Sequence, residues 1–124
     1  MRLIVLAGIL ACGILAGCRP HPPITRETII GSYIYKSEDP ESRQTDHEWD
    51  RLTLQADGRY DLVRGGPTKP RTVETGTWRL VSWPKTPNGK LLLLNETSYP
   101  IEMKENEVRL LVDLDVGIWW AKVK

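Results

Sequence analysis

The 124-residue sequence predicts an all-β domain, an antiparallel up-and-down meander of about eight strands that closes into a small barrel. From Glu27 onward, apolar residues come in short runs, which is the spacing of strands and not of helices. Clusters of Gly, Pro, Asn and Asp separate these runs and supply the turns. An open sheet of this size would leave two exposed edges, and closure into a barrel removes both.

The expected strands follow one another with short connections, apart from a polar loop at Ser37–Asp46 after the first strand. An alternative for Ile101–Val112 is a single helix, because Glu, Lys and Met favour helices. The strands are centred on Thr28–Lys36, Leu52–Leu54, Tyr60–Leu62, Arg71–Trp83, Leu91–Leu94, Tyr99–Met103, Val108–Val112 and Ile118–Val123.

The second hairpin has a register that can be predicted from its turn. A two-residue turn at Asp57-Gly58 would set Leu54 opposite Asp61, an apolar residue against a charge. A three-residue turn with Gly58 in the left-handed conformation pairs Leu54 with Tyr60 and buries one consistent face. The same register pairs Leu52 with Leu62 and is the one we expect.

The first residues have the features of an export signal. Met1-Arg2 gives a positive start, and Leu3–Gly17 is an apolar run shorter than the about 20 residues that span a membrane. An uncleaved apolar anchor with an incidental cysteine is the alternative. Leu15-Ala16-Gly17-Cys18 resembles the lipobox of bacterial lipoproteins. That resemblance implies cleavage before Cys18 and attachment of lipid to its thiol.

This resemblance divides the chain into a signal peptide at 1–17, a Pro-rich lipid-anchored tether at 18–26 and a barrel domain at 27–124. Arg19 stands where inner-membrane lipoproteins commonly carry Asp, so the resemblance implies the outer membrane, facing the periplasm. The expected membrane partner is reached through the lipid on Cys18. Cys12 leaves with the signal, so the domain must be held by its core without a disulfide.

Three short motifs carry a second resemblance. Gly31-Ser32-Tyr33, the segment Leu52–Tyr60 with its central Asp57-Gly58, and Gly76-Thr77-Trp78 together are similar to small lipocalin-like bacterial lipoproteins. The family pattern is G-x-W/Y, then L-x-L-x-x-D-G-x-Y, then G-x-W, and the fold it implies is an up-and-down β-barrel. Copper-responsive relatives carry a C-x-x-C pair that this sequence lacks, so metal sensing does not carry over.

Composition argues against several functions. The formal net charge is only +1, so no nucleic-acid partner that depends on phosphate neutralisation is expected. His21 and His47 are interpreted as solvated tether or loop residues, and no metal or cofactor is expected. The sequence has no nucleophile elbow or phosphate loop, and Asp113 and Asp115 are interpreted as turn residues, so the protein is not expected to be an enzyme.

Two functions remain. The first is a non-catalytic interaction or accessory module of the envelope, with a protein partner or self-association. The alternative is a barrel that holds a small apolar or amphipathic ligand in its mouth, lined by Tyr33, Tyr60, Trp78 and Trp119. Because adjacent strand residues point to opposite faces, Trp119 and Trp120 cannot both lie inside. The outer one either packs under a loop or the N-terminal segment, or belongs to an exposed patch.

Overall fold

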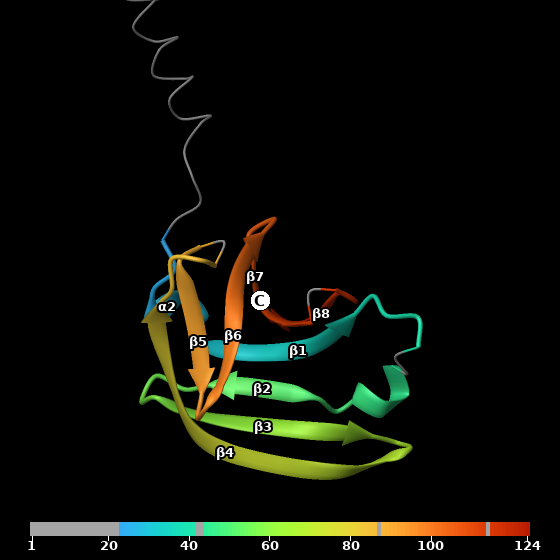
Figure 1. The fold of residues 1–124 in the computed structure, drawn as a ribbon. Coiled ribbons are helices and arrows are strands. Elements are labelled where there is room, and N and C mark those ends of the chain that lie inside the picture. Colours follow the sequence, from blue (N-terminus) through green and yellow to red (C-terminus); the bar gives the residue numbers. More distant parts are fainter. Residues whose placement is uncertain (1–22, 42–43, 87, 114) are drawn as a thin grey trace, which may run out of the picture.

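The computed structural model describes residues 23–41, 44–86, 88–113 and 115–124, and it confirms the predicted all-β barrel. Eight antiparallel strands close in sequence order, β1 pairing with β8 (Figure 1). No helix within these ranges is long and apolar enough to cross a membrane. The strands are β1 (Gly31–Ser37), β2 (Arg51–Leu54), β3 (Arg59–Gly66), β4 (Lys69–Ser82), β5 (Lys90–Leu94), β6 (Thr97–Lys104), β7 (Glu107–Asp113) and β8 (Ile118–Lys122).

The β2–β3 hairpin has the predicted register. Leu54 pairs with Tyr60 and Leu52 with Leu62. Gly58 has a φ of 89°, and its N–H donates to the carbonyl of Gln55 at 3.1 Å. This left-handed residue turns the chain without a steric penalty, because glycine has no Cβ. All four paired apolar side chains therefore face the core.

The helical alternative for residues 101–112 is wrong, because β6 and β7 form a hairpin there. Glu105 and Asn106 connect the two strands with φ values of 52° and 65°. Two consecutive positive φ values define a type I′ turn, whose twist matches that of antiparallel strands. The turn thus overrides the helix propensity of the flanking Glu, Lys and Met residues.

The first strand begins later than expected, because a short helix precedes it. Helix α2 (Arg26–Ile29) is capped by Thr25, whose hydroxyl accepts from the Thr28 N–H while the Thr28 hydroxyl accepts from the Thr25 N–H. This reciprocal capping satisfies two backbone donors that a strand would have paired with a neighbour. β1 starts only at Gly31, and Ile29 is fully buried. A 3₁₀ helix, η1 (Gln44–His47), begins in the predicted polar loop and ends one residue beyond it.

The hydrophobic core occupies the barrel interior. Alternation along the strands sends one set of side chains inward, as Leu92 and Leu94 show beside the half-buried Leu91 and Leu93. Ile24, which precedes α2, also belongs to this core and is 3% exposed. The core comprises Ile24, Ile29, Tyr33, Leu52, Leu54, Tyr60, Leu62, Trp78, Leu92, Leu94, Tyr99, Ile101, Val108, Leu110 and Trp120.

Strand β4 changes partner along its length. Its residues from Lys69 to Thr77 pair with β3, whereas Trp78–Ser82 pair with β5. Asn95, which follows β5, donates its N–H to the Thr77 carbonyl at 2.9 Å and marks the point where β5 pairing ends. The first half of β4 therefore lies at a border of the barrel, seen at the bottom of Figure 1.

Candidate functional site

The end of the barrel nearest α2 is closed, and Tyr33 belongs to this closure. The Tyr33 hydroxyl donates to the Ile29 carbonyl at 2.6 Å, and the side chain is fully buried. Lys122 Nζ donates to the Thr28 carbonyl at 2.6 Å. Burial raises the pKa of Tyr33 and lowers that of Lys122, since each charged form loses hydration. Tyr33 therefore holds α2 on the barrel.

Trp78 lies at the same end and is 3% exposed. Its indole N–H donates to the Gln55 carbonyl at 2.8 Å, and the Arg26 guanidinium lies 4.4 Å from the ring centroid. Arg26 also donates to the Ala56 carbonyl at 3.1 Å. These contacts join α2 to the β2–β3 turn and cover the indole from solvent.

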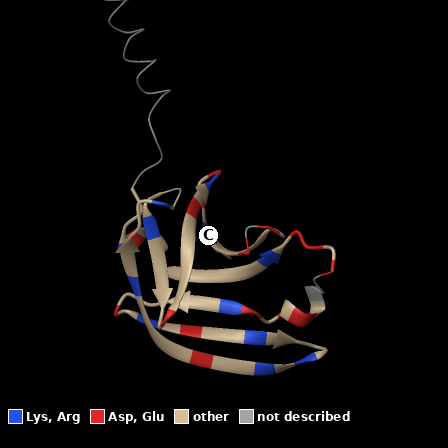
Figure 2. Ribbon diagram, in the orientation of Figure 1, with Lys and Arg blue, Asp and Glu red and all other residues tan. Residues whose placement is uncertain are grey.

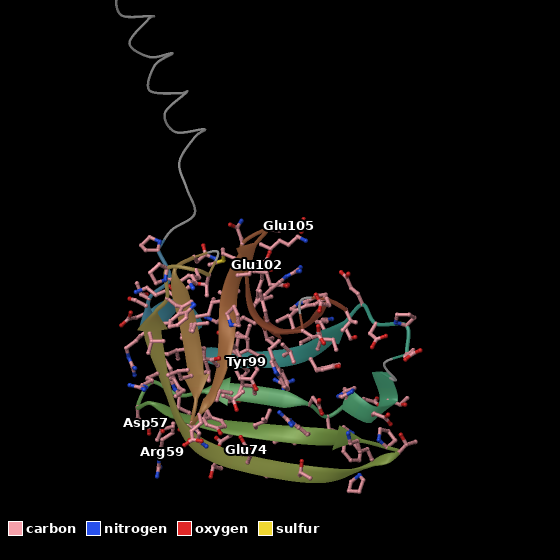
Figure 3. All side chains as sticks on the ribbon, viewed as in Figure 1. Asp57, Arg59, Glu74, Tyr99, Glu102 and Glu105 are labelled. Carbon is pink, nitrogen blue, oxygen red and sulfur yellow. The ribbon has the colours of Figure 1, made fainter. Side chains whose placement is uncertain are left out.

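Tyr60 also belongs to the core and is 1% exposed. Its hydroxyl donates to Glu74 Oε2 at 2.6 Å and accepts from Asn95 Nδ2 at 3.0 Å. Burial, followed by the hydrogen bond to Glu74, raises the pKa of Tyr60 to about 12. Figure 3 labels Glu74, the hydrogen-bond partner of the Tyr60 hydroxyl, on β4, and Tyr99 on β6. The Tyr60 hydroxyl thus both donates and accepts a hydrogen bond within the chain.

Trp119 lies on the outer surface, whereas its neighbour Trp120 is buried. The Arg109 guanidinium stacks 4.6 Å from the Trp119 ring centroid, and Arg109 Nε donates to Glu107 Oε1 at 2.9 Å. The Trp119 indole N–H is buried without a hydrogen-bond partner among the described residues. The four aromatic residues predicted to line one mouth are thus divided between the core and the outer surface. Their ligand-binding role stays a prediction.

The opposite end of the barrel contains a small cavity of about 210 Å³, which we call the open end. Inward-facing aromatic side chains line one part of it, and Arg64 lies at its border. Burial raises the pKa of Tyr99, while the nearby Arg64 charge opposes part of that rise. The residues lining the open end are Tyr35, Asp46, His47, Asp50, Arg64, Gly65, Lys69, Tyr99, Val112 and Trp120.

Asp50 fixes the segment that covers the open end. It is 6% exposed, and its Oδ1 accepts from the Gly65 N–H while Oδ2 contacts His47 Nδ1, both at 2.8 Å. The His47 ring stacks on Tyr35 with centroids 3.9 Å apart. The interpretation of His47 as a solvated loop residue is therefore corrected, because this half-buried side chain packs against β1 and joins η1 to β3 through Asp50.

A larger hollow of about 610 Å³ lies on the outside of β1, β2 and β3, and we call it the outer groove. Trp49 stands in its wall with 47% of its surface exposed. Lys36, Arg51 and Arg71 surround it, and none of them pairs with a carboxylate of the described residues. The groove is lined by Ile34, Tyr35, Lys36, His47, Glu48, Trp49, Asp50, Arg51, Val63 and Arg71.

Other predicted site residues have simpler outcomes. Asp113 Oδ1 accepts from the Asp115 N–H at 3.0 Å, which confirms a turn role. Cys18 and His21 lie outside the described residues. Within the described ranges, no three His, Cys, Asp or Glu side chains gather where they could hold a metal ion.

Sequence reasoning missed Trp49, Asp50 and Arg64 as site residues. The signal for the first was present, since a tryptophan inside a polar stretch has no strand pattern to bury it. Arg64 gave a weaker signal, because it occupies an inward position of the alternating strand that contains Tyr60 and Leu62.

No protein-family model matches the chain, and no curated protein matches it at a significant level. The functional interpretation therefore follows from the geometry of the open end and the outer groove.

Proposed function

We propose that this protein is a non-catalytic interaction module of the bacterial cell envelope, anchored by lipid on Cys18, with the outer groove as its docking surface. The observation that carries the proposal is that the barrel interior is filled whereas its outer surface is hollowed. Core side chains fill the barrel, and a hollow of about 610 Å³ lies outside it.

Carriage of a ligand inside the barrel receives less support. The cavity at the open end is about 210 Å³, below the roughly 300–1,000 Å³ of typical small-molecule pockets. Tyr33 and Tyr60 occupy the interior with their hydroxyl groups hydrogen-bonded inside the chain. A ligand of ordinary size would have to displace part of the core.

The outer groove has the chemistry of a protein interface. Tryptophan and arginine are the side chains that most often dominate binding energy at interfaces. Trp49, Arg51 and Arg71 supply both types around one hollow. The hydrogen bonds of Asp50 to Gly65 and His47 hold the Trp49 backbone in place, so the wall is formed before binding. Preformed walls reduce the entropy lost on association.

The position of the proposed anchor suits this surface. The chain packs on the barrel from Ile24 onward at the α2 end, and the six steps from Cys18 to Ile24 span at most about 20 Å. The outer groove includes Ile34 and Lys36 from the half of β1 remote from α2. An anchor at Cys18 would therefore hold the α2 end near the membrane and present the groove away from it.

Site-specific photo-crosslinking in the source bacterium tests this proposal. A photoreactive phenylalanine analogue at position 49 should give one abundant adduct with an envelope protein, while the same group at exposed Lys104 should not. Lys104 is the matched control because it ends β6 at the tip of the β6–β7 hairpin. Equal labelling at both positions would overturn the docking surface. Mass spectrometry of the same preparation should show acylated Cys18, and an unmodified thiol would overturn the anchor.

A further inference from the structure

The first half of β4 has a strand neighbour on one side only. Trp78 donates its N–H to the Gly58 carbonyl on the β3 side at 2.8 Å, whereas the Thr77 carbonyl accepts from Asn95 on the β5 side. In an antiparallel strand, the N–H and C=O of one residue point to the same side and successive residues alternate. Val73 and Thr75 therefore direct their backbone groups away from β3. No described strand pairs with them there, and we call this stretch the free edge.

The free edge is unusually accessible. Residues 69–75 are all exposed, and Val73 is 60% exposed. Native proteins commonly protect such edges with Lys, Pro or a bulge. Lys69, Pro70 and Arg71 give that protection near the β3–β4 turn. The following Thr72–Thr75 is an extended stretch with three β-branched residues and has no such protection.

Both faces beside the free edge carry a cation. Arg71 lines the outer groove, and Arg64 lines the open end on the inner side. Neither forms an ion pair with the described residues, nor does Lys69. In Figure 2, blue bands lie on β3 and β4 toward their shared turn, and red bands lie further along both strands. Side chains of an added strand alternate between the two faces, so a segment with acidic residues on both faces would meet a cation on each.

A second copy of this chain fits the free edge less well. An antiparallel pair of two β4 strands centred on Val73 would set Arg71 opposite Thr75 and Thr72 opposite Glu74. No cation would face a carboxylate in that arrangement. Glu74 is moreover hydrogen-bonded to Tyr60 within its own chain. Charge complementarity therefore favours an acidic partner segment.

We propose that the free edge of β4 accepts an extended acidic segment of a partner protein as an additional strand. The inference rests on the proposed interaction function and names the chemistry of the partner. Backbone hydrogen bonds to Val73 and Thr75 would supply affinity, while Arg71 and Arg64 would select acidic side chains. The added strand would border the outer groove and the open end together.

A synthetic heptapeptide of sequence Val-Glu-Glu-Val-Glu-Glu-Val is the probe, because an extended strand of it carries glutamates on both faces. It is added to the full-length protein in detergent. It should shift the amide signals of Val73 and Thr75 and slow their hydrogen exchange. The same peptide methylated on alternate backbone nitrogens, and its lysine-for-glutamate version, should not bind. Binding by the methylated peptide would overturn strand addition, and equal binding by the lysine peptide would overturn the acidic preference.

Val73→Pro removes one edge donor without removing a bond to β3, because that N–H points away from β3. Loss of this hydrogen bond should lower the affinity of the protein for the peptide about tenfold. The matched variant Val73→Thr keeps the N–H and the branched shape, and so separates the donor from the side chain. Unweakened binding by a folded Val73→Pro protein would overturn the proposal. Should that variant not fold, Arg71→Glu supplies the second test, with reversal of the preference toward the lysine peptide expected and no change contradicting it.

Three further outcomes separate the possibilities. Amides of Val73 and Thr75 that are protected without peptide, together with concentration-dependent sedimentation, would overturn the acidic partner in favour of a second copy. Crosslinking from position 49 that survives Val73→Pro would overturn the free edge and leave the outer groove standing. Protection of both amides by the peptide, with no adduct from position 49, would support the free edge while the proposed function fails.

Discussion

Replacing Asp50 with alanine should destabilise the barrel and release the segment that forms the groove wall. Asp50 accepts two hydrogen bonds at 2.8 Å, one from the buried backbone of Gly65 and one with His47. Trp49 donates its own N–H to the Gly65 carbonyl at 2.9 Å. Loss of the carboxylate therefore affects the anchoring of the neighbouring tryptophan as well.

The expected cost follows from the two groups that lose a partner. An unsatisfied buried N–H costs about 1–3 kcal/mol, and a hydrogen bond to a charged group contributes about 1.5–3 kcal/mol. Because local rearrangement lets solvent reach part of the site, we expect the free energy of unfolding to fall by about 2–4 kcal/mol. For a domain of this size the corresponding decrease in Tm is roughly 10–20 °C.

Urea unfolding monitored by tryptophan fluorescence measures this loss, and the exchange rate of the Gly65 amide locates it. Asp50→Asn should cost less, because its amide oxygen can still accept from Gly65. Glu48→Ala is the control, since this exposed neighbour lies in the same segment. A loss below about 0.5 kcal/mol for Asp50→Ala, the range of ordinary surface substitutions, would refute the anchoring role.

The remaining predictions concern the core and its edges. Trp120→Ala should lower the free energy of unfolding by about 3–5 kcal/mol, whereas Trp119→Ala should cost only about 1–2 kcal/mol; equal losses in urea unfolding would contradict the assigned faces. Gly76→Ala should cost about 1–3 kcal/mol, because a Cβ there would lie 2.5 Å from Asn95 Oδ1; wild-type stability would show that Asn95 moves freely. The raised pKa of Tyr60 stabilises the fold below its unfolded value of 10.0, and this stabilisation is lost as pH rises toward about 12. Tyr60→Phe should therefore flatten the alkaline part of the stability profile, and an unchanged profile would contradict the shift.

Local turn chemistry explains why so much of the fold was predictable. The Asp57-Gly58 turn and the alternation around it determine the partners of Leu54 and Tyr60 within a few residues of chain. The helix at Arg26–Ile29 and the type I′ turn at Glu105-Asn106 were harder to predict. Glu105 is an uncommon residue at positive φ, so pairing of the two strands, and not its own preference, places it there.

The candidate site was not predictable because its parts depend on contacts between distant segments. Arg64, Asp50 and Trp120 meet at the open end only after the barrel closes. The free edge has the same origin, since β4 is one uninterrupted pattern in the sequence and its change of partner at Thr77 depends on where β5 ends. Pairing of β1 with β8 closes the barrel, so that every strand has a neighbour on each side over part of its length. It does not require every strand to be paired on both sides along its full length. A long strand beside a short one therefore leaves an unpaired stretch even in a closed barrel, and in this protein that stretch is the free edge at Val73 and Thr75, the site of the proposed strand addition.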